Sequence, residues 1–174
     1  MGLQQQLGFR TRRANVLQRA MQHVAGTRPM AWLFQRTMYK LDRPLHRLTG
    51  GRITMPGLLT GLPVILLTTT GAKSGQRRTM PLIGVPHGDD LAVVGTNYAQ
   101  PRNPGWVYNL QAHPSAQVTW REVTTPVRAR AASPQETQQV WRNAGDLYRG
   151  FSAYRSRIHH REVKIFVLEP SSDP

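Results

Sequence analysis

The chain has 174 residues, 39% of them hydrophobic, which is enough for one core and favours a single main domain. Its 23 Lys and Arg residues against 9 Asp and Glu give a formal net charge of +14, so we expect an anionic partner such as a phosphorylated cofactor, an acidic lipid surface or nucleic acid. The absence of cysteine excludes disulfides, a thiolate nucleophile and cysteine-ligated metal centres, so a redox role would need a bound cofactor.

Residues 1–60 are predicted to form a basic, helical N-terminal extension. Apolar residues recur at helical spacing in its first part, and the pattern resumes after Pro29 and runs to Gly50-Gly51: Leu17, Ala20, Met21, Val24, then Leu33, Leu41, Leu45 and Leu48. Arginines decorate these segments, as a solvated face or as a docking surface for an anionic membrane. Since no stretch has the length of a signal peptide or a membrane span, we expect a cytoplasmic protein, with the inner face of the cell membrane as a peripheral site.

From Pro63 onward the hydrophobic pattern changes to that of strands. Strands are predicted at 63–70, 77–85, 90–96, two within 116–131, and 162–170. Connections such as 86–90 are too short for parallel crossovers, so the sheet should be largely antiparallel, and strands of this length indicate a small barrel. The expected fold class is therefore α+β: a small antiparallel barrel domain over 61–170, with flanking helices and a short tail at 171–174.

Two helices are predicted to interrupt the strands, at 103–114 and 133–148. The second should begin at Ser133 as N-cap, with Pro134 in the first turn and Glu136 completing a capping box. Aromatic residues follow at i, i+3 and i+6: Tyr148, Phe151 and Tyr154. Such a stripe is either part of a core or the wall of a pocket for a flat aromatic ligand.

The stretch "LLTTTGAKSGQRRTMP", residues 66–81, places a basic glycine turn after a buried strand. A P-loop would need Lys-Ser directly after the second glycine and then a helix, whereas Lys73 and Ser74 precede Gly75 and a strand follows. The glycine spacing of a dinucleotide fold is missing too. What remains is a basic hairpin turn, either solvated or an anion site, in which backbone N–H groups converge beside Lys73, Arg77 and Arg78.

Other kinds of site find no support in the sequence. The six histidines lack metal-ligand spacing, so no metal is predicted, and no serine lies in a nucleophile elbow. Nucleic-acid binding would favour a basic face interleaved with stacking aromatics, but the tryptophans are scattered along the chain.

Together these segments resemble the deazaflavin-dependent nitroreductase and quinone reductase family, which uses reduced 8-hydroxy-5-deazaflavin, coenzyme F-420. The matching residues are "GLPVILLTTTGAKSGQRRTMPL" (61–82), "VVGTN" (93–97), "NPGWVYNLQAHPSAQV" (103–118), and "LYRGFSAYRSRI" with "FVLEP" (147–170). The resemblance covers about the last two thirds of the chain and implies a split β-barrel, consistent with the short antiparallel strands.

The resemblance also implies a cofactor site. The cofactor phosphate and acidic tail would lie on Lys73, Ser74, Gly75, Gln76 and Arg78, with Pro81 closing the turn. The deazaflavin ring would meet Val94, Gly95, Thr96 and Asn97, with Trp106 and Asn109 lining the same site. Met80 and Ile83 stand where members often have an asparagine and an aromatic, so the acceptor side is expected to differ. Asn97 stands where some members have a lysine, which implies a weaker hold on the anionic tail of the cofactor. Related barrels bind FMN, which is the alternative cofactor.

The implied chemistry is hydride transfer to a quinone, a nitroaromatic or a similar activated acceptor. A reduced deazaflavin carries its hydride on carbon, so the protein need only stack the acceptor and stabilise the anion that forms. Tyr148, Tyr154 or Thr96 would donate a hydrogen bond or proton, and the acceptor would lie on Ile83, Tyr148, Phe151 and Tyr154. The alternatives are an FMN-binding split-barrel oxidoreductase and a non-catalytic deazaflavin carrier at a membrane.

Overall fold

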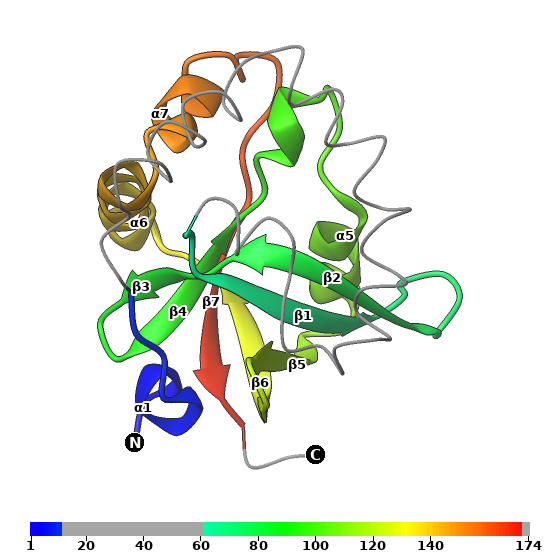
Figure 1. Ribbon diagram of the computed structural model, residues 1–174. Helices are drawn as coiled ribbons and strands as arrows, with labels where there is room; N and C mark the ends of the chain where they lie inside the picture. Colours follow the sequence, from blue (N-terminus) through cyan, green and yellow to red (C-terminus); the bar gives the residue numbers. More distant parts are fainter. Residues whose placement is uncertain (12–60, 172–174) are drawn as a thin grey trace.

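The computed structural model describes residues 1–11 and 61–171, and in these ranges an antiparallel sheet of seven strands curls on itself in the order β2-β1-β5-β6-β7-β4-β3 (Figure 1). The strands are β1 (Val64–Thr70), β2 (Arg77–Ile83), β3 (Val85–His87), β4 (Asp90–Val94), β5 (Ser115–Trp120), β6 (Val123–Ala131) and β7 (Ile165–Pro170). The helices are α1 (Leu3–Leu7), the 3-10 turn η1 (Asn97–Ala99), α5 (Gly105–Ala112), α6 (Pro134–Leu147) and α7 (Gly150–Arg155). The predicted antiparallel α+β fold is confirmed.

The strand predicted at 90–96 ends at Val94, and strand boundaries differ further from the prediction at two other places. The single strand predicted at 77–85 is two strands, because the chain leaves β2 at Gly84, whose N–H donates to the carbonyl of Pro63 at 2.9 Å. The last strand begins at Ile165, because Arg161 and the residues after it turn towards the loop that follows β4. Both changes shorten strands and leave the predicted order intact.

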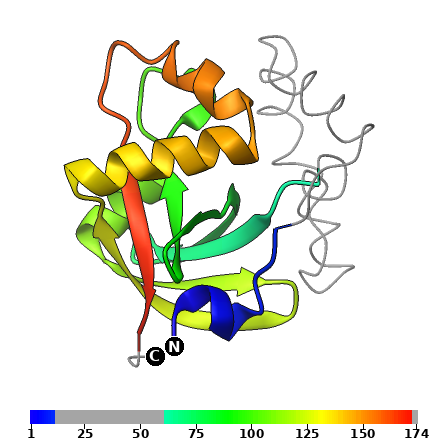
Figure 2. The same cartoon turned by 90° about the vertical axis from the view of Figure 1, so that its left-hand side faces the viewer.

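The capping box predicted for α6 is present. Ser133 Oγ accepts from the N–H of Glu136 at 3.2 Å, and the N–H of Ser133 donates to Glu136 Oε2 at 2.8 Å. Arg130, on β6, donates to both oxygens of the same carboxylate, which holds the pKa of Glu136 well below its usual range. These contacts fix the start of α6 against the sheet, and Figure 2 shows α6 lying across the upper end of the strands with α7 above it.

Two apolar clusters form the core. The first fills the barrel and includes Ile65 and Leu67 of β1, both fully buried. Leu3, Leu7 and Phe9 belong to it too, and Phe9 packs on Trp120 with ring centroids 4.7 Å apart. Residues 1–11 are therefore part of the barrel, whereas the sequence placed them in a separate basic extension. The helices and membrane-docking face predicted within 12–60 lie outside the described residues.

The second cluster lies where α6 and α7 cover β3 and β4. It contains Val94, Trp141, Tyr148, Phe151 and Tyr154, with Ile83 packed against its side. The four residues predicted to contact the acceptor, from Ile83 to Tyr154, are thus brought into one apolar cluster although 71 positions separate them.

Candidate functional site

The turn between β1 and β2 is closed by hydrogen bonds within its own backbone. Gly71 N–H donates to the carbonyl of Gln76, and Gly75 N–H donates to the carbonyl of Gly71, each at 2.8 Å. Gln76 N–H approaches Ser74 Oγ at 3.4 Å. The predicted backbone nest is therefore smaller than expected, because these N–H groups already have acceptors.

Side chains above Gly71 supply the remaining donors. If Gly71 carried a Cβ, that atom would lie 2.6 Å from Ser74 Oγ and 3.5 Å from Arg78 Nε. These two groups therefore converge above Gly71, where the missing side chain leaves space. Lys73, Ser74 and Arg78 are exposed. Arg77 alternates to the other side of β2 and donates to Gln117 Oε1. The result is an open cradle of cationic and hydroxyl groups at the predicted anion site.

Asn109 holds this cradle from below. Only 8% exposed, it accepts from the N–H of Ala72 at 3.0 Å and donates to Thr69 Oγ1 at 3.0 Å. It therefore acts on the turn through the backbone of Ala72, and α5 fixes where the turn lies. The sequence predicted Asn109 as a lining residue, and the structure gives it this supporting contact.

Two other predicted residues lie elsewhere than expected. Pro81 does not close the turn: it lies in the middle of β2 opposite Leu66, on an edge strand that tolerates the loss of an N–H donor. Trp106 is 2% exposed and packs against Phe166, with ring centroids 6.0 Å apart, because α5 directs this side chain into the barrel. Its indole belongs to the core and does not line the cradle.

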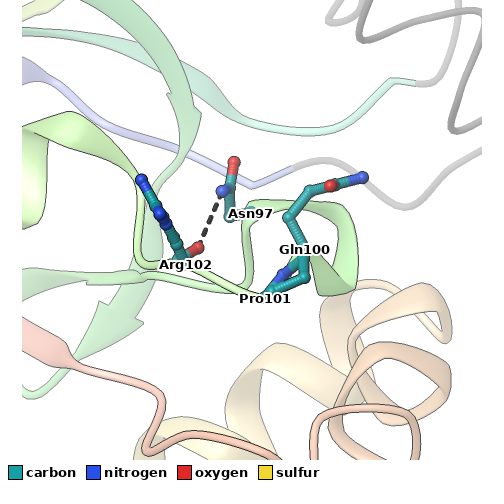
Figure 3. Close-up of a pocket in the computed structure, with 4 residues that line it drawn as sticks. All are labelled: Asn97, Gln100, Pro101 and Arg102. Carbon is teal, nitrogen blue, oxygen red and sulfur yellow. Dashed lines mark hydrogen bonds between the residues drawn. The ribbon is translucent and has the colours of Figure 1, made fainter.

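The loop at 95–103 connects β4 to α5 and contains an unusual backbone. Asn97, Tyr98 and Ala99 have φ values of 45°, 52° and 60°, three consecutive non-glycine residues in the left-handed region. This region is unfavourable for side chains with a Cβ, and such residues concentrate at functional sites. Asn97 Nδ2 donates to the carbonyl of Arg102 at 2.9 Å, and Figure 3 shows the side chains of Asn97 and Gln100 on the same side of the loop.

Arg161 holds this loop, and the sequence analysis missed it. Its guanidinium donates to the carbonyls of Gly95 at 3.0 Å, Thr96 at 2.8 Å and Gln100 at 3.0 Å, and to Asn103 Oδ1 at 2.6 Å. Burial lowers the pKa of Arg161, but an arginine remains a cation. Nothing in the local sequence around this single arginine indicates that it would hold the loop.

The backbone predicted to face the deazaflavin ring is largely engaged by the protein. The N–H of Gly95 donates to the carbonyl of Lys164, and that of Thr96 to the carbonyl of Val94, both at 2.9 Å. Val94 is paired with Ile165 in the sheet. Asn97, with Gln100, Pro101 and Arg102, lines an open hollow of about 260 Å³ (Figure 3).

The loop meets the predicted tyrosine pair at its left-handed turn. Tyr98 packs edge-on against Tyr154, with ring centroids 6.3 Å apart and an interplanar angle of 86°. Tyr148 and Tyr154 are each 6% exposed and share a hydrogen bond, whereas Tyr98 is 40% exposed. Tyr98, Tyr148 and Tyr154 form the tyrosine cluster, and Tyr98, which the sequence analysis overlooked, is its exposed face.

Burial raises the pKa of both Tyr148 and Tyr154 above the ordinary value for tyrosine. Both hydroxyls are therefore neutral throughout the physiological pH range and can donate hydrogen bonds. Since the folded-state pKa is raised, the stability linked to these groups is fully present below about pH 10 and is lost as the pH rises further.

The sequence model of the F420H(2)-dependent quinone reductase family matches residues 39–170. The chain belongs to this family. An F420H(2)-dependent quinone reductase of Mycobacterium tuberculosis is 32% identical over 137 residues, which cover 75% of this chain and 89% of the relative. Family membership confirms the resemblance seen in the sequence, and with it an enzyme whose cofactor is reduced coenzyme F-420.

Solved structures agree with the family and the fold. An F420-H2-dependent reductase, FDR-A, is 31% identical with a TM-score of 0.57, over 62% of this chain and 94% of that chain. A chain described as a domain-swapped dimer is 28% identical with a TM-score of 0.59, over 81% of this chain and 99% of that chain. The predicted split-barrel fold is thereby confirmed.

The turn at 71–78 fits an anionic group such as the phosphate and acidic tail of this family's cofactor. Its side chains carry three cations and no carboxylate, and the cradle above Gly71 would be filled by a single Cβ.

Among the helices in 1–11 and 61–171, none is both long and apolar enough to cross a membrane.

Proposed function

We propose that this family member reduces a quinone by hydride transfer, with the anion cradle holding the cofactor tail and the tyrosine cluster holding the acceptor. The observation that supports this most is the position of Tyr98, 40% exposed and packed on the buried Tyr148–Tyr154 pair. A flat quinone needs a flat aromatic partner and neutral hydrogen-bond donors, and this cluster offers both.

In this proposal Lys73, Ser74 and Arg78 bind the anionic tail through charge-assisted hydrogen bonds, with Gly75 and Gln76 shaping the turn. Asn109 fixes the turn to α5, and α5 begins directly after the loop that carries Tyr98. The two ends of the site are thus joined by one short helix. When bound, reduced coenzyme F-420 supplies the hydride.

The tyrosines act on the acceptor side. Tyr148 and Tyr154, neutral at physiological pH, act as a hydrogen-bonded pair in which one hydroxyl donates to the other. The hydroxyl that accepts this bond donates its own proton to the acceptor oxygen on which negative charge develops, directly or through Tyr98. The apolar residues around them, Phe151 and Ile83, exclude water from the face of the acceptor. Thr96 is half-buried at the loop and is the other candidate donor.

Turnover tests the acceptor assignment. With reduced coenzyme F-420 and menadione, oxidation of the cofactor should require the protein, and isotope carried on the ring carbon should leave as hydride. A set of nitroaromatics assayed beside the quinones decides between the two acceptor classes by kcat/KM. Tight FMN binding, with no protein-dependent oxidation of coenzyme F-420 by any quinone or nitroaromatic, would be the contradicting result and would favour the flavin alternative.

We also propose that the arginine-rich residues within 12–60 contact an anionic membrane, where hydrophobic quinones reside. Because Leu3, Leu7 and Phe9 lie in the barrel core, removing the N-terminus would unfold the barrel, so charge substitution is the better test. Changing Arg12, Arg13, Arg19 and Arg28 to Gln should reduce co-sedimentation with vesicles containing phosphatidylserine. Arg121 and Arg128 changed to Gln provide the control, and equal sedimentation of both variants and wild type would refute the proposal.

A further inference from the structure

The three left-handed residues need an external restraint. Asn97, Tyr98 and Ala99 each carry a Cβ in a backbone region that disfavours one. Hydrogen bonds within the loop run from Ala99 N–H to the Thr96 carbonyl, from Gln100 N–H to the Asn97 carbonyl and from Asn97 Nδ2 to the Arg102 carbonyl, each at 2.9 Å. A loop of this kind keeps its shape only where the surrounding structure over-determines it.

Arg161, in the segment before β7, supplies that restraint through its guanidinium group. It contacts the residues just before the left-handed turn, at Gly95 and Thr96, and those just after it, at Gln100 and Asn103. The two Nη atoms and Nε of one planar group thus tie both ends of the turn to the segment before β7. A lysine, with one flexible point charge, cannot meet these acceptors together.

The left-handed turn also sets the position of Tyr98, the exposed member of the tyrosine cluster. Tyr98 is the middle residue of the three, and its ring meets Tyr154 edge-on. If the turn relaxed to right-handed values, the direction of the Tyr98 side chain would change, and the ring would leave Tyr154.

We infer that Arg161 is a positioning residue for the acceptor: it holds the left-handed turn that presents Tyr98 beside Tyr154. The inference rests on the proposed function for its kinetic consequence. Its structural consequence is that the conformation of the 95–103 loop depends on Arg161, and this can be measured in the protein without cofactor or acceptor.

The first measurement is hydrogen exchange of the cofactor-free protein. In Arg161→Gln, amides of residues 96–103 should exchange about tenfold faster or more, while those of β4 and β7 keep the wild-type rates. Arg128→Gln, which removes the same charge from an exposed site on β6, should leave all segments unchanged. Unchanged exchange at 96–103, or a uniform increase across the barrel, would overturn the inference.

The second measurement distinguishes an effect on kcat from an effect on the binding of coenzyme F-420. With menadione, Arg161→Gln should lower kcat by about 10- to 100-fold, as expected for a misplaced reacting pair, with a smaller loss of affinity for coenzyme F-420, whose anionic tail is proposed to lie on the 71–78 turn. Arg161→Lys should behave like Arg161→Gln. A wild-type rate in Arg161→Lys would show that charge alone suffices and would reject the positioning role.

A second-site variant tests the backbone argument itself. Glycine adopts left-handed values without a Cβ, so Ala99→Gly in the Arg161→Gln background should recover part of kcat and slow the exchange at 96–103. No recovery of either would count against the inference. If wild type shows no turnover with any acceptor, the proposed function fails, while the exchange measurements still decide the role of Arg161.

Discussion

Gly150→Ala is expected to displace the ring of Tyr148 and to lower both stability and turnover. A Cβ at Gly150 would lie 2.2 Å from Cε1 and from Cζ of Tyr148 and 2.5 Å from its hydroxyl, closer than atoms can pack. The ring cannot yield easily, because it is 6% exposed and packs on Phe151 with centroids 6.0 Å apart. Overpacking of this kind costs about 1–3 kcal/mol, which lowers Tm by roughly 2–12 °C in a domain of this size.

Turnover should fall further than stability, because the Tyr148 hydroxyl would leave Tyr154 and the acceptor side. We expect kcat with menadione to fall about tenfold or more, while the Kd of coenzyme F-420, which we propose is set at the 71–78 turn, changes little. Calorimetry and steady-state kinetics measure the two effects.

Gly145→Ala is the matched control for this prediction. Gly145 lies in α6, and a Cβ there meets only Ser152 Oγ, at 3.2 Å, the end of a side chain that can rotate. Alanine is a better helix former than glycine, so this variant should be as stable as wild type or about 0.5–1 kcal/mol more stable. If Gly150→Ala matched Gly145→Ala in both Tm and kcat, Tyr148 would have no restricted position, and its assigned role would fail.

The sequence was informative where local chemistry decides the structure. The capping box at Ser133 and Glu136 depends on residues three positions apart and forms as predicted. The antiparallel order follows from short connections between apolar segments, so the alternation of strands could be predicted as well. The 71–78 turn could be predicted as a candidate anion site because its cations and glycines lie together in the sequence.

Features that depend on contacts between residues far apart in the chain could not be predicted from the sequence. Arg161 lies 66 positions from Gly95, and only the pairing of β4 with β7 brings them together. Tyr98 escaped notice because its importance comes from a left-handed backbone, which non-glycine residues do not signal. The resemblance placed Trp106 at the cofactor site, whereas α5 turns its indole into the barrel core, an orientation that no local pattern in the sequence indicates.

The double variant Lys73→Ala/Arg78→Ala is expected to produce the largest loss of cofactor affinity. Each cation offers a charge-assisted hydrogen bond to the anionic tail, and Arg78 Nε converges with Ser74 Oγ above Gly71, where one ligand group would meet both. Such contacts contribute about 1.5–3 kcal/mol each. Removing both should therefore weaken the Kd of coenzyme F-420 by roughly 10²- to 10⁴-fold, discounted towards the lower end because the turn is exposed.

The fold should survive this change, since Lys73 and Arg78 are exposed and the turn is closed by backbone bonds between Gly71, Gly75 and Gln76. Arg121→Ala/Arg128→Ala removes two positive charges from exposed positions outside the turn, so this control separates local contacts from the general attraction of a +14 protein for an anion. A fluorescence titration with coenzyme F-420 at two salt concentrations measures both variants. If the two double variants lost affinity equally, and by a factor that vanished at high salt, the cofactor tail would be held by net charge alone and the 71–78 turn would not be its site.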